Sequence, residues 1–173
     1  MEASIESEQD TIRVLGLGNE ILADDAVGIL AAREAGRRLS GRAGVVCSRA
    51  AGFDLLDDLL GVSRLVVVDA IVTGAKPGTV HLFTADRFRP LPGVAPHLLG
   101  IFDVLAVAER LRLPVPRETT VIAVEAADCT TVGGPMHPDV VAAIPVVADW
   151  IEQFLSEVLR RQTCPGQTHF GLS

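Results

Sequence analysis

The sequence has few aromatic residues and no long apolar run, and these absences exclude some classes of protein. Aromatic residues make up only 4% of the 173 residues, but apolar residues make up 49%, which excludes a disordered or low-complexity chain. No apolar run approaches the roughly 20 residues of a membrane span. The acidic start MEASIESEQD does not fit a secretory signal. We therefore expect a cytoplasmic protein with no membrane partner.

Cysteines and basic residues are also few. Cys47, Cys129 and Cys164 are an odd, scattered set that fits neither a disulfide framework nor a CxxC metal knuckle. Fifteen basic residues against 22 acidic ones give a net charge of -7. Phosphate binding needs a basic footprint, so we expect no nucleic-acid partner. The length fits a single domain, 1–173, with an ordered core of about 11–160 between frayed tails.

Hydrophobic patterning predicts strands that alternate with helices. The strand candidates are 11–19, 44–50, 64–72, 79–83 and 119–126, and the helix candidates are 24–40, 53–61, 97–112 and 137–160. Pro145 predicts a kink or a break in the last helix. The short turn after 64–72 favours an antiparallel pairing of 79–83 with that strand. We predict an α/β protein, a three-layer α/β/α sandwich with helices on both faces. Its sheet is mostly parallel and twisted, with about five strands, one of them antiparallel.

Three polar residues lie where open α/β sheets bind ligands, at the carboxyl ends of the strands. Glu20 follows the first strand, Asp69 closes an apolar run, and His97 opens a helix. Each also has a plainer interpretation: Glu20 caps the next helix, Asp69 accepts hydrogen bonds from loop amides, and His97 is an exposed loop histidine. Two carboxylates and an imidazole together suit Zn, Ni, Mn or Fe(II), with open positions left for a substrate.

Other residues of the first glycine-rich segment have supporting roles in this prediction. Asp24 or Asp25 can cap helix 24–40, and we expect both to support the site residues rather than to bind a metal directly. Asn19 orients Glu20, donates to an oxyanion, or simply forms a turn. The segment begins like a dinucleotide fingerprint, but Ile21 stands where the third glycine belongs, so we expect no organic cofactor.

The order and spacing of these motifs resemble the hydrogenase maturation protease family over roughly residues 12–158. The match begins with the segment from Gly16 to Gly28, which contains GLGN and the Asp24–Asp25 pair. Asp69-Ala70 then ends a hydrophobic strand before a PG turn, and His97 opens an apolar helix. Glu125, Gly133-Gly134 and Pro138-Asp139 match in the same order. Ala26 departs from the glycine that the family usually has there, and alanine fits if its φ is negative.

The resemblance implies an endopeptidase that removes a C-terminal peptide from the nickel-loaded large-subunit precursor of a nickel–iron hydrogenase. It implies that Glu20, Asp69 and His97 contact the metal and carry the catalysis, by an aspartic-type or a metal-assisted hydrolysis. The nickel is expected to belong to the substrate. The protein partner is then the precursor, and the free protease is expected to be a monomer.

Two other functions fit parts of the same pattern. A metal-sensing chaperone that docks on a metalloenzyme precursor would use the same three residues without cleaving anything. Peptidyl-tRNA hydrolases also open with a strand and GLGN, but they need a basic face for tRNA, which the charge of -7 disfavours. For a protease, the loops 88–96 and 127–136 flank the predicted site, and we expect them to grip the C-terminal segment of the substrate.

Overall fold

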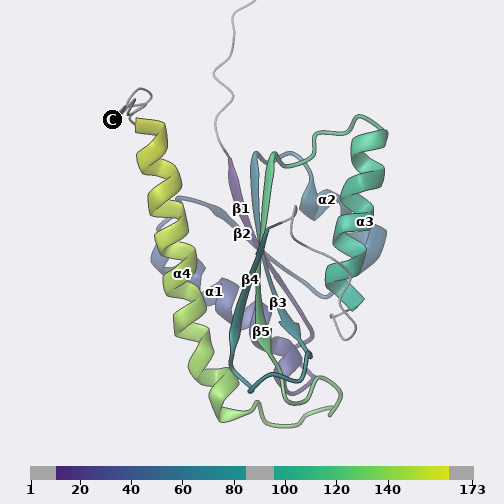
Figure 1. The fold of residues 1–173 in the computed structure, drawn as a ribbon, viewed down its shortest axis with the longest axis vertical. Coiled ribbons are helices and arrows are strands. Elements are labelled where there is room, and N and C mark those ends of the chain that lie inside the picture. The colour runs from purple at the N-terminus through teal and green to yellow at the C-terminus, as the bar shows by residue number, and fades with distance from the viewer. Residues whose placement is uncertain (1–10, 85–95, 164–173) are drawn as a thin grey trace, which may run out of the picture.

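The computed structural model describes residues 11–84 and 96–163, with side chains for 11–84 and 100–160. A five-stranded sheet lies between two layers of helices (Figure 1). Helices α1 (Val27–Leu39) and α4 (Pro138–Thr163) cover one face, and α2 (Leu56–Leu59) and α3 (Pro96–Arg110) lie over the other. The strands are β1 (Ile12–Leu17), β2 (Gly44–Ser48), β3 (Arg64–Ile71), β4 (Val80–Thr84) and β5 (Glu118–Glu125). The predicted three-layer sandwich is confirmed.

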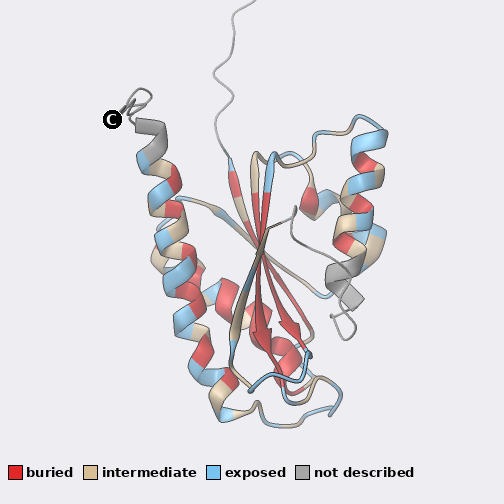
Figure 2. Cartoon of the chain, in the orientation of Figure 1, coloured by how far each residue is buried: buried red, intermediate tan, exposed pale blue. Residues whose placement is uncertain are grey.

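The sheet has the order β2-β1-β3-β5-β4, and every pairing except that of β4 with β5 is parallel. Its central strands are buried on both faces (Figure 2). Alternate residues of β3 supply the two cores: Val66 and Val68 pack toward α1 and α4, whereas Leu65 and Val67 pack toward α2 and α3. This explains why β3 is a continuous apolar run rather than an alternating one.

The predicted pairing of the fourth strand was wrong. Residues 79–83 were expected to form a hairpin with 64–72, but β4 pairs antiparallel with β5 instead. Strand β5 lies between β3 and β4 and pairs with β3 along eight positions. The physical reason is burial: β5 is apolar on both sides and takes a central place, whereas the half-buried β4 suits the edge.

Two helix predictions also need correction. The predicted helix 53–61 is only a 3-10 turn, η2 (Gly52–Leu55), followed by the single turn of α2. Pro145 does not break α4, which continues to Thr163. Proline removes one helical hydrogen bond, which frees the carbonyl of Val141. Both residues lie on the exposed side of the helix, where water can satisfy that carbonyl.

The start of α1 packs directly onto the sheet because small residues leave room for it. A Cβ on Gly28 would overlap the carbonyl oxygens of Leu17 on β1 and Val68 on β3. A Cβ on Gly16 would in turn lie 2.6 Å from the Cβ of Ala32. Helix α1 therefore approaches strands β1 and β3 more closely than a side chain at position 16 or 28 would permit. The glycines of the first motif serve this contact rather than a nucleotide.

Before α1, the 3-10 turn η1 (Asp24–Ala26) lies against the end of β1. Gly18 has a φ of +135°, and a Cβ there would overlap the carbonyl oxygen of Asp25. Ala26 has a φ of -68°, so the alanine that departs from the family motif sits in ordinary helical backbone. Its methyl group is buried and causes no backbone strain.

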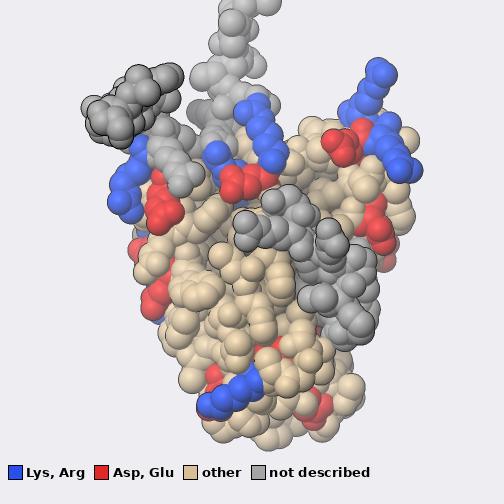
Figure 3. Space-filling view, viewed as in Figure 1, with Lys and Arg blue, Asp and Glu red and all other residues tan. Residues whose placement is uncertain are grey.

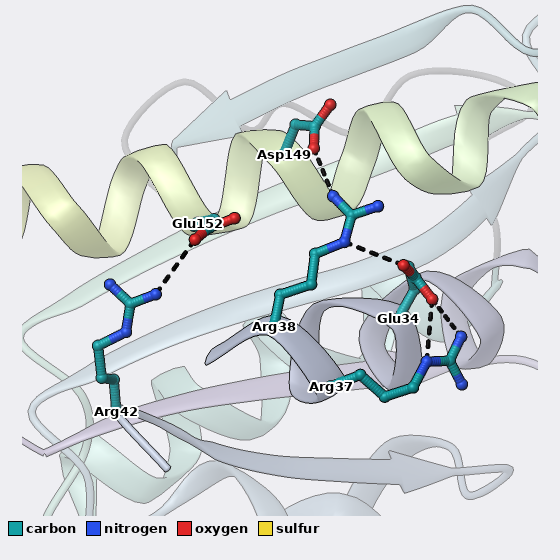
Figure 4. Close-up of polar contacts among 6 residues, drawn as sticks. All are labelled: Glu34, Arg37, Arg38, Arg42, Asp149 and Glu152. Atoms are coloured by element: carbon teal, nitrogen blue, oxygen red, sulfur yellow. Dashed lines mark hydrogen bonds and ion pairs between the residues drawn. The ribbon is translucent and has the colours of Figure 1, made fainter. Parts of the chain in front are cut away.

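Ion pairs tie the outer sides of α1 and α4 together (Figure 4). The guanidinium of Arg38 binds Glu34 on its own helix and Asp149 on α4. Arg42, just after α1, reaches Glu152 of α4 at 3.2 Å. These groups are half-buried or exposed and lie at the surface, where salt screens them, so they orient the helices while the apolar contacts beneath them supply the stability. Among the helices of the described residues, none is long and apolar enough to cross a membrane.

We expect Gly28→Ala to lower the free energy of unfolding by more than about 2 kcal/mol, because the added methyl group forces α1 away from the sheet. Urea denaturation followed by circular dichroism measures this. Gly36→Ala on the same helix is the matched control. Its Cβ would lie 3.2 Å from a methyl group of Val45, which can shift, so stability should change little. Equal stability of the two variants would contradict the close packing at Gly28.

Candidate functional site

The carboxyl ends of the parallel strands meet at one edge of the sheet, as predicted, and Asp69 lies there within β3. Its side chain is fully buried. One carboxylate oxygen accepts the backbone N–H of Ala70 at 2.8 Å, and the other has no hydrogen-bond partner among the described residues. Buried polar atoms are nearly always satisfied, so an unpartnered carboxylate oxygen at a sheet edge marks a position kept for function.

The protonation of Asp69 follows from this environment. Burial raises its pKa to about 8, the N–H of Ala70 opposes the shift, and the negative charge of Asp25 adds to it. Asp25 is itself buried and belongs to η1, which contacts β3. Burial, together with the charge of Asp25, therefore keeps Asp69 protonated near neutral pH.

Glu20 lies elsewhere. It is exposed, and its carboxylate forms an ion pair with Arg33 on the outside of α1, with the second oxygen 3.1 Å from the guanidinium. This hydrogen bond lowers the pKa of Glu20 below its usual value. Glu20 makes no capping hydrogen bond to the helices that follow it. The carboxylate whose charge acts on Asp69 is that of Asp25.

Asp24 has a structural function that the sequence did not reveal. It was expected as a helix cap, but neither η1 nor α1 has a side-chain capping hydrogen bond. Its two oxygens instead accept backbone N–H groups from Ala127 at 2.8 Å, Asp128 at 2.9 Å and His137 at 2.6 Å. This buried carboxylate fastens the loop after β5 to the segment that carries Asp25. The sequence separation of more than 100 residues hid this contact.

Glu125 is a second buried acid that anchors a loop. Its carboxylate accepts the backbone N–H groups of Thr73, Gly74 and Ala75 and contacts Nε2 of His81 at 3.2 Å. Burial alone would raise the pKa of Glu125, but the hydrogen bonds from Thr73 hold it below its usual value. Glu125 thus fixes the connection between β3 and β4, and His81 packs against it on the edge strand. Sequence analysis had noted Glu125 only as a motif match.

Cys129 interacts electrostatically with Asp69, and Asn19 belongs to the turn that follows β1. Burial and the charges of Asp25 and Asp24 raise the pKa of the half-buried Cys129 to about 12, so this thiol is neutral and a poor nucleophile. Asn19 accepts the N–H of Ile21 at 3.3 Å and its own carbonyl accepts that of Leu22, which supports the turn interpretation. A cysteine-hydrolase mechanism therefore has no support at this edge.

His97 is the second residue of α3, so a helix does begin where predicted. Its side chain lies outside the described residues. Among the side chains that are described, no three His, Cys, Asp or Glu residues lie close enough to hold a metal ion. The expected ligand set of Glu20, Asp69 and His97 therefore stays a prediction.

Known proteins are similar to this chain in both sequence and fold. The family model for hydrogenase maturation proteases matches residues 43–154. The hydrogenase expression/formation protein HupD of Bradyrhizobium diazoefficiens is 31% identical, over 87% of this chain and 81% of its own. The hydrogenase 2 maturation protease of Escherichia coli is also 31% identical, over 86% of this chain and 88% of its own.

Solved structures agree with these sequence matches. The hydrogenase-maturating endopeptidase HybD of E. coli has a TM-score of 0.70 at 26% identity, over 86% of this chain and 93% of that one. The [NiFe] hydrogenase maturation protease HybD of Thermococcus kodakarensis has a TM-score of 0.65 at the same identity, over 84% and 99%. The peptidyl-tRNA hydrolase alternative has no support among them. By sequence and by fold, the chain belongs to the hydrogenase maturation protease family.

Proposed function

We propose that this protease removes a C-terminal peptide from the large-subunit precursor of a nickel–iron hydrogenase, and that it does so after nickel has been inserted. The observation that carries the catalytic part is the fully buried Asp69, with one unpartnered oxygen, beside Asp25. Ligands of open α/β sheets bind outside the carboxyl ends of the strands, which is where Asp69 lies in β3.

The pair of acids supplies what peptide hydrolysis needs. One group has to take a proton from the attacking water, and another has to give a proton to the leaving nitrogen. Asp69 and Asp25 can provide both, because burial and the negative charge of Asp25 favour the protonated form of Asp69. With a pKa of about 8, Asp69 is the proton donor at neutral pH. Asp25 is then the base that accepts the proton of water.

Nickel enters this scheme as part of the substrate. Carboxylate oxygens and a neutral imidazole are ligands that a borderline divalent cation accepts, so Asp69 and His97 are suitable contacts. The position of Asp25 makes it a better third contact than Glu20, which already binds Arg33. A cation next to a carboxyl group favours the ionised form. The proton that the cation displaces from Asp69 would go to the leaving nitrogen, and Asp25 would take the proton of the attacking water, so metal loading would be coupled to the cut.

Intact-mass measurements on a mixture of protease and precursor test this proposal. We expect a defined C-terminal peptide to be lost only from the nickel-loaded precursor. Asp69→Asn and Asp25→Asn should slow the cleavage at least about 100-fold, because each removes a proton-transfer group. Glu20→Gln, which changes an exposed acid of the same motif, should stay within about tenfold of the wild type, a difference of about 1.4 kcal/mol in barrier.

Circular dichroism should show all three variants folded. Full activity of Asp25→Asn together with loss of activity in Glu20→Gln would restore Glu20 to the site and remove Asp25 from it. A stable complex of the wild-type protein with the loaded precursor, without any cleavage, would favour the chaperone alternative.

The raised pKa of Asp69 also predicts how stability depends on pH. The folded state keeps the proton of Asp69 up to about pH 8, whereas the unfolded chain loses it near 3.8. The folded state thus binds more protons in this window, and stability falls as pH rises, by on the order of 1.4 kcal/mol per pH unit. Asp69→Asn should not show this contribution. Urea denaturation of chelator-treated protein at pH 5 and pH 7.5 measures the difference, and parallel pH curves for both proteins would refute the shift.

A further inference from the structure

Asp24 joins segments that lie far apart in the sequence. Its carboxylate accepts the backbone N–H groups of Ala127 and Asp128, which follow β5, and of His137, which precedes α4. The side chain is only 1% exposed, so water competes little for these hydrogen bonds. Asp24 is therefore bound by both ends of the loop that connects β5 with α4.

The backbone before and at Asp24 is paired with the same loop. Three backbone hydrogen bonds, of 2.7 to 3.1 Å, connect residues 21–24 with residues 128–133. An antiparallel bridge joins Leu22 to Val132 within this short ladder. The side chain of Asp24 therefore completes a contact that its backbone begins, and the segment that leads into η1 has a fixed place relative to the loop.

The loop is in turn fixed to the strand that carries Asp69. Ala126, where the loop begins, donates its N–H to the carbonyl of Ile71 at the end of β3, at 2.8 Å. Ile71 is two residues beyond Asp69. Within the loop, Cys129 interacts electrostatically with both Asp69 and Asp25. A continuous set of contacts thus leads from the end of β3, through the loop, to Asp24.

Asp25 comes directly after Asp24 and lies in the same 3-10 turn, η1. The turn is three residues long and has no side-chain capping hydrogen bond. So short an element has little stability of its own, and its position depends on its contacts. Those contacts are the packing of α1 at Gly28, after the turn, and the hydrogen bonds of Asp24 within it.

Asp24 itself is not accessible to a substrate, because its side chain is buried. On the face drawn in Figure 3, acidic side chains reach the surface only as small, separate patches at the lower end of the molecule, where the strands of Figure 1 end. A change at position 24 therefore alters the geometry of the site without removing a contact with the precursor.

We propose that Asp24 is a positioning residue for the cleavage, because its hydrogen bonds to the loop after β5 fix Asp25 relative to Asp69. This inference rests on the proposed function, since it assigns a further residue to the same site. Reacting groups have to be held in place closely, and a displacement of about 1 Å can cost about 100-fold in rate. A role in folding alone would lower stability and leave kcat of the folded enzyme unchanged.

The kinetics of precursor cleavage distinguish these two roles. We expect Asp24→Ala, which removes all three hydrogen bonds, to lower kcat about 100-fold and to leave KM within about twofold. Asp24→Asn keeps one oxygen for the N–H groups of Ala127 and Asp128 but places an NH₂ group opposite the N–H of His137. This more conservative variant should retain more activity, with kcat lowered about tenfold.

Asp128→Ala is the matched control. The carboxylate of Asp128 also accepts three hydrogen bonds, from the backbone N–H groups of Thr130 and Thr131 and from the hydroxyl of Thr130. These donors lie within the loop itself rather than on the segment that carries Asp25. Its removal should therefore leave kcat within about twofold of the wild type.

A double-mutant cycle shows whether the effect passes through Asp25. In enzyme that already carries Asp25→Asn, adding Asp24→Asn should lower kcat by less than about twofold further, because the base that Asp24 positions is already gone. If the two residues acted independently, their separate losses would multiply.

Hydrogen exchange followed by mass spectrometry measures the same contact without any cleavage. In Asp24→Asn, the backbone amides of residues 23–27 and 127–137 should exchange faster than in the wild type, and those of β3 should keep their wild-type rates. Circular dichroism should show this variant folded, so Asp24→Asn gives the test at the smaller disturbance of the structure.

Three results would overturn the positioning role. The first is wild-type kcat in folded Asp24→Asn, the second is losses that multiply in the double variant, and the third is unchanged exchange around Asp25. The proposed function fails separately, if the wild-type enzyme does not cleave the nickel-loaded precursor or if Asp25→Asn cleaves it at the wild-type rate. In that case the exchange measurement still decides whether Asp24 holds the turn that carries Asp25.

Discussion

The close approach of α1 to the sheet is the constraint on which the site depends. Gly28 allows the helix to touch the carbonyl groups of β1 and β3, and this fixes where η1 lies. Asp25 is thereby held beside Asp69, and Asp24 is held where it can bind the loop after β5. Any residue larger than glycine at position 28 would push α1 away from the carbonyl groups of both strands. In the proposed mechanism, stability and catalysis therefore depend on one contact.

Asp24, Glu125 and Asp69 are buried acids near the carboxyl ends of the strands, and their different surroundings give the same functional group different roles. Asp24 and Glu125 are saturated by backbone N–H groups, which stabilise the ionised form and make them anchors for loops. Asp69 receives only the N–H of Ala70 and keeps an oxygen without a partner. The supply of hydrogen-bond donors, rather than residue type or depth, therefore distinguishes Asp69, the proposed catalytic acid, from the two acids that anchor loops.

Much of the fold could be predicted from the sequence because hydrophobic patterns over short segments identify the strands and helices. The long apolar runs of β3 and β5 identified central strands, and Asp69 lies near the carboxyl end of β3, as its place after such a run predicted. The partner of β4 could not be predicted, because it depends on a strand that follows some 35 residues later. Which of Glu20 and Asp25 is buried could not be predicted either: both acids follow β1, and the structure buries Asp25 in the 3-10 turn and leaves Glu20 exposed.

The insertion of β5 between β3 and β4 has a consequence for the order of assembly. In the described sheet, β4 has β5 as its neighbour, so it cannot take its place until β5, which follows it in the chain, is there to pair with it. Strand β4 is then among the last strands to be placed, together with helix α4, which also follows β5 in the chain. A newly synthesised chain that ends before this point already contains Asp25 and Asp69, but it lacks the loop after β5 that Asp24 binds. The surroundings of those two acids are thereby completed only in the finished fold.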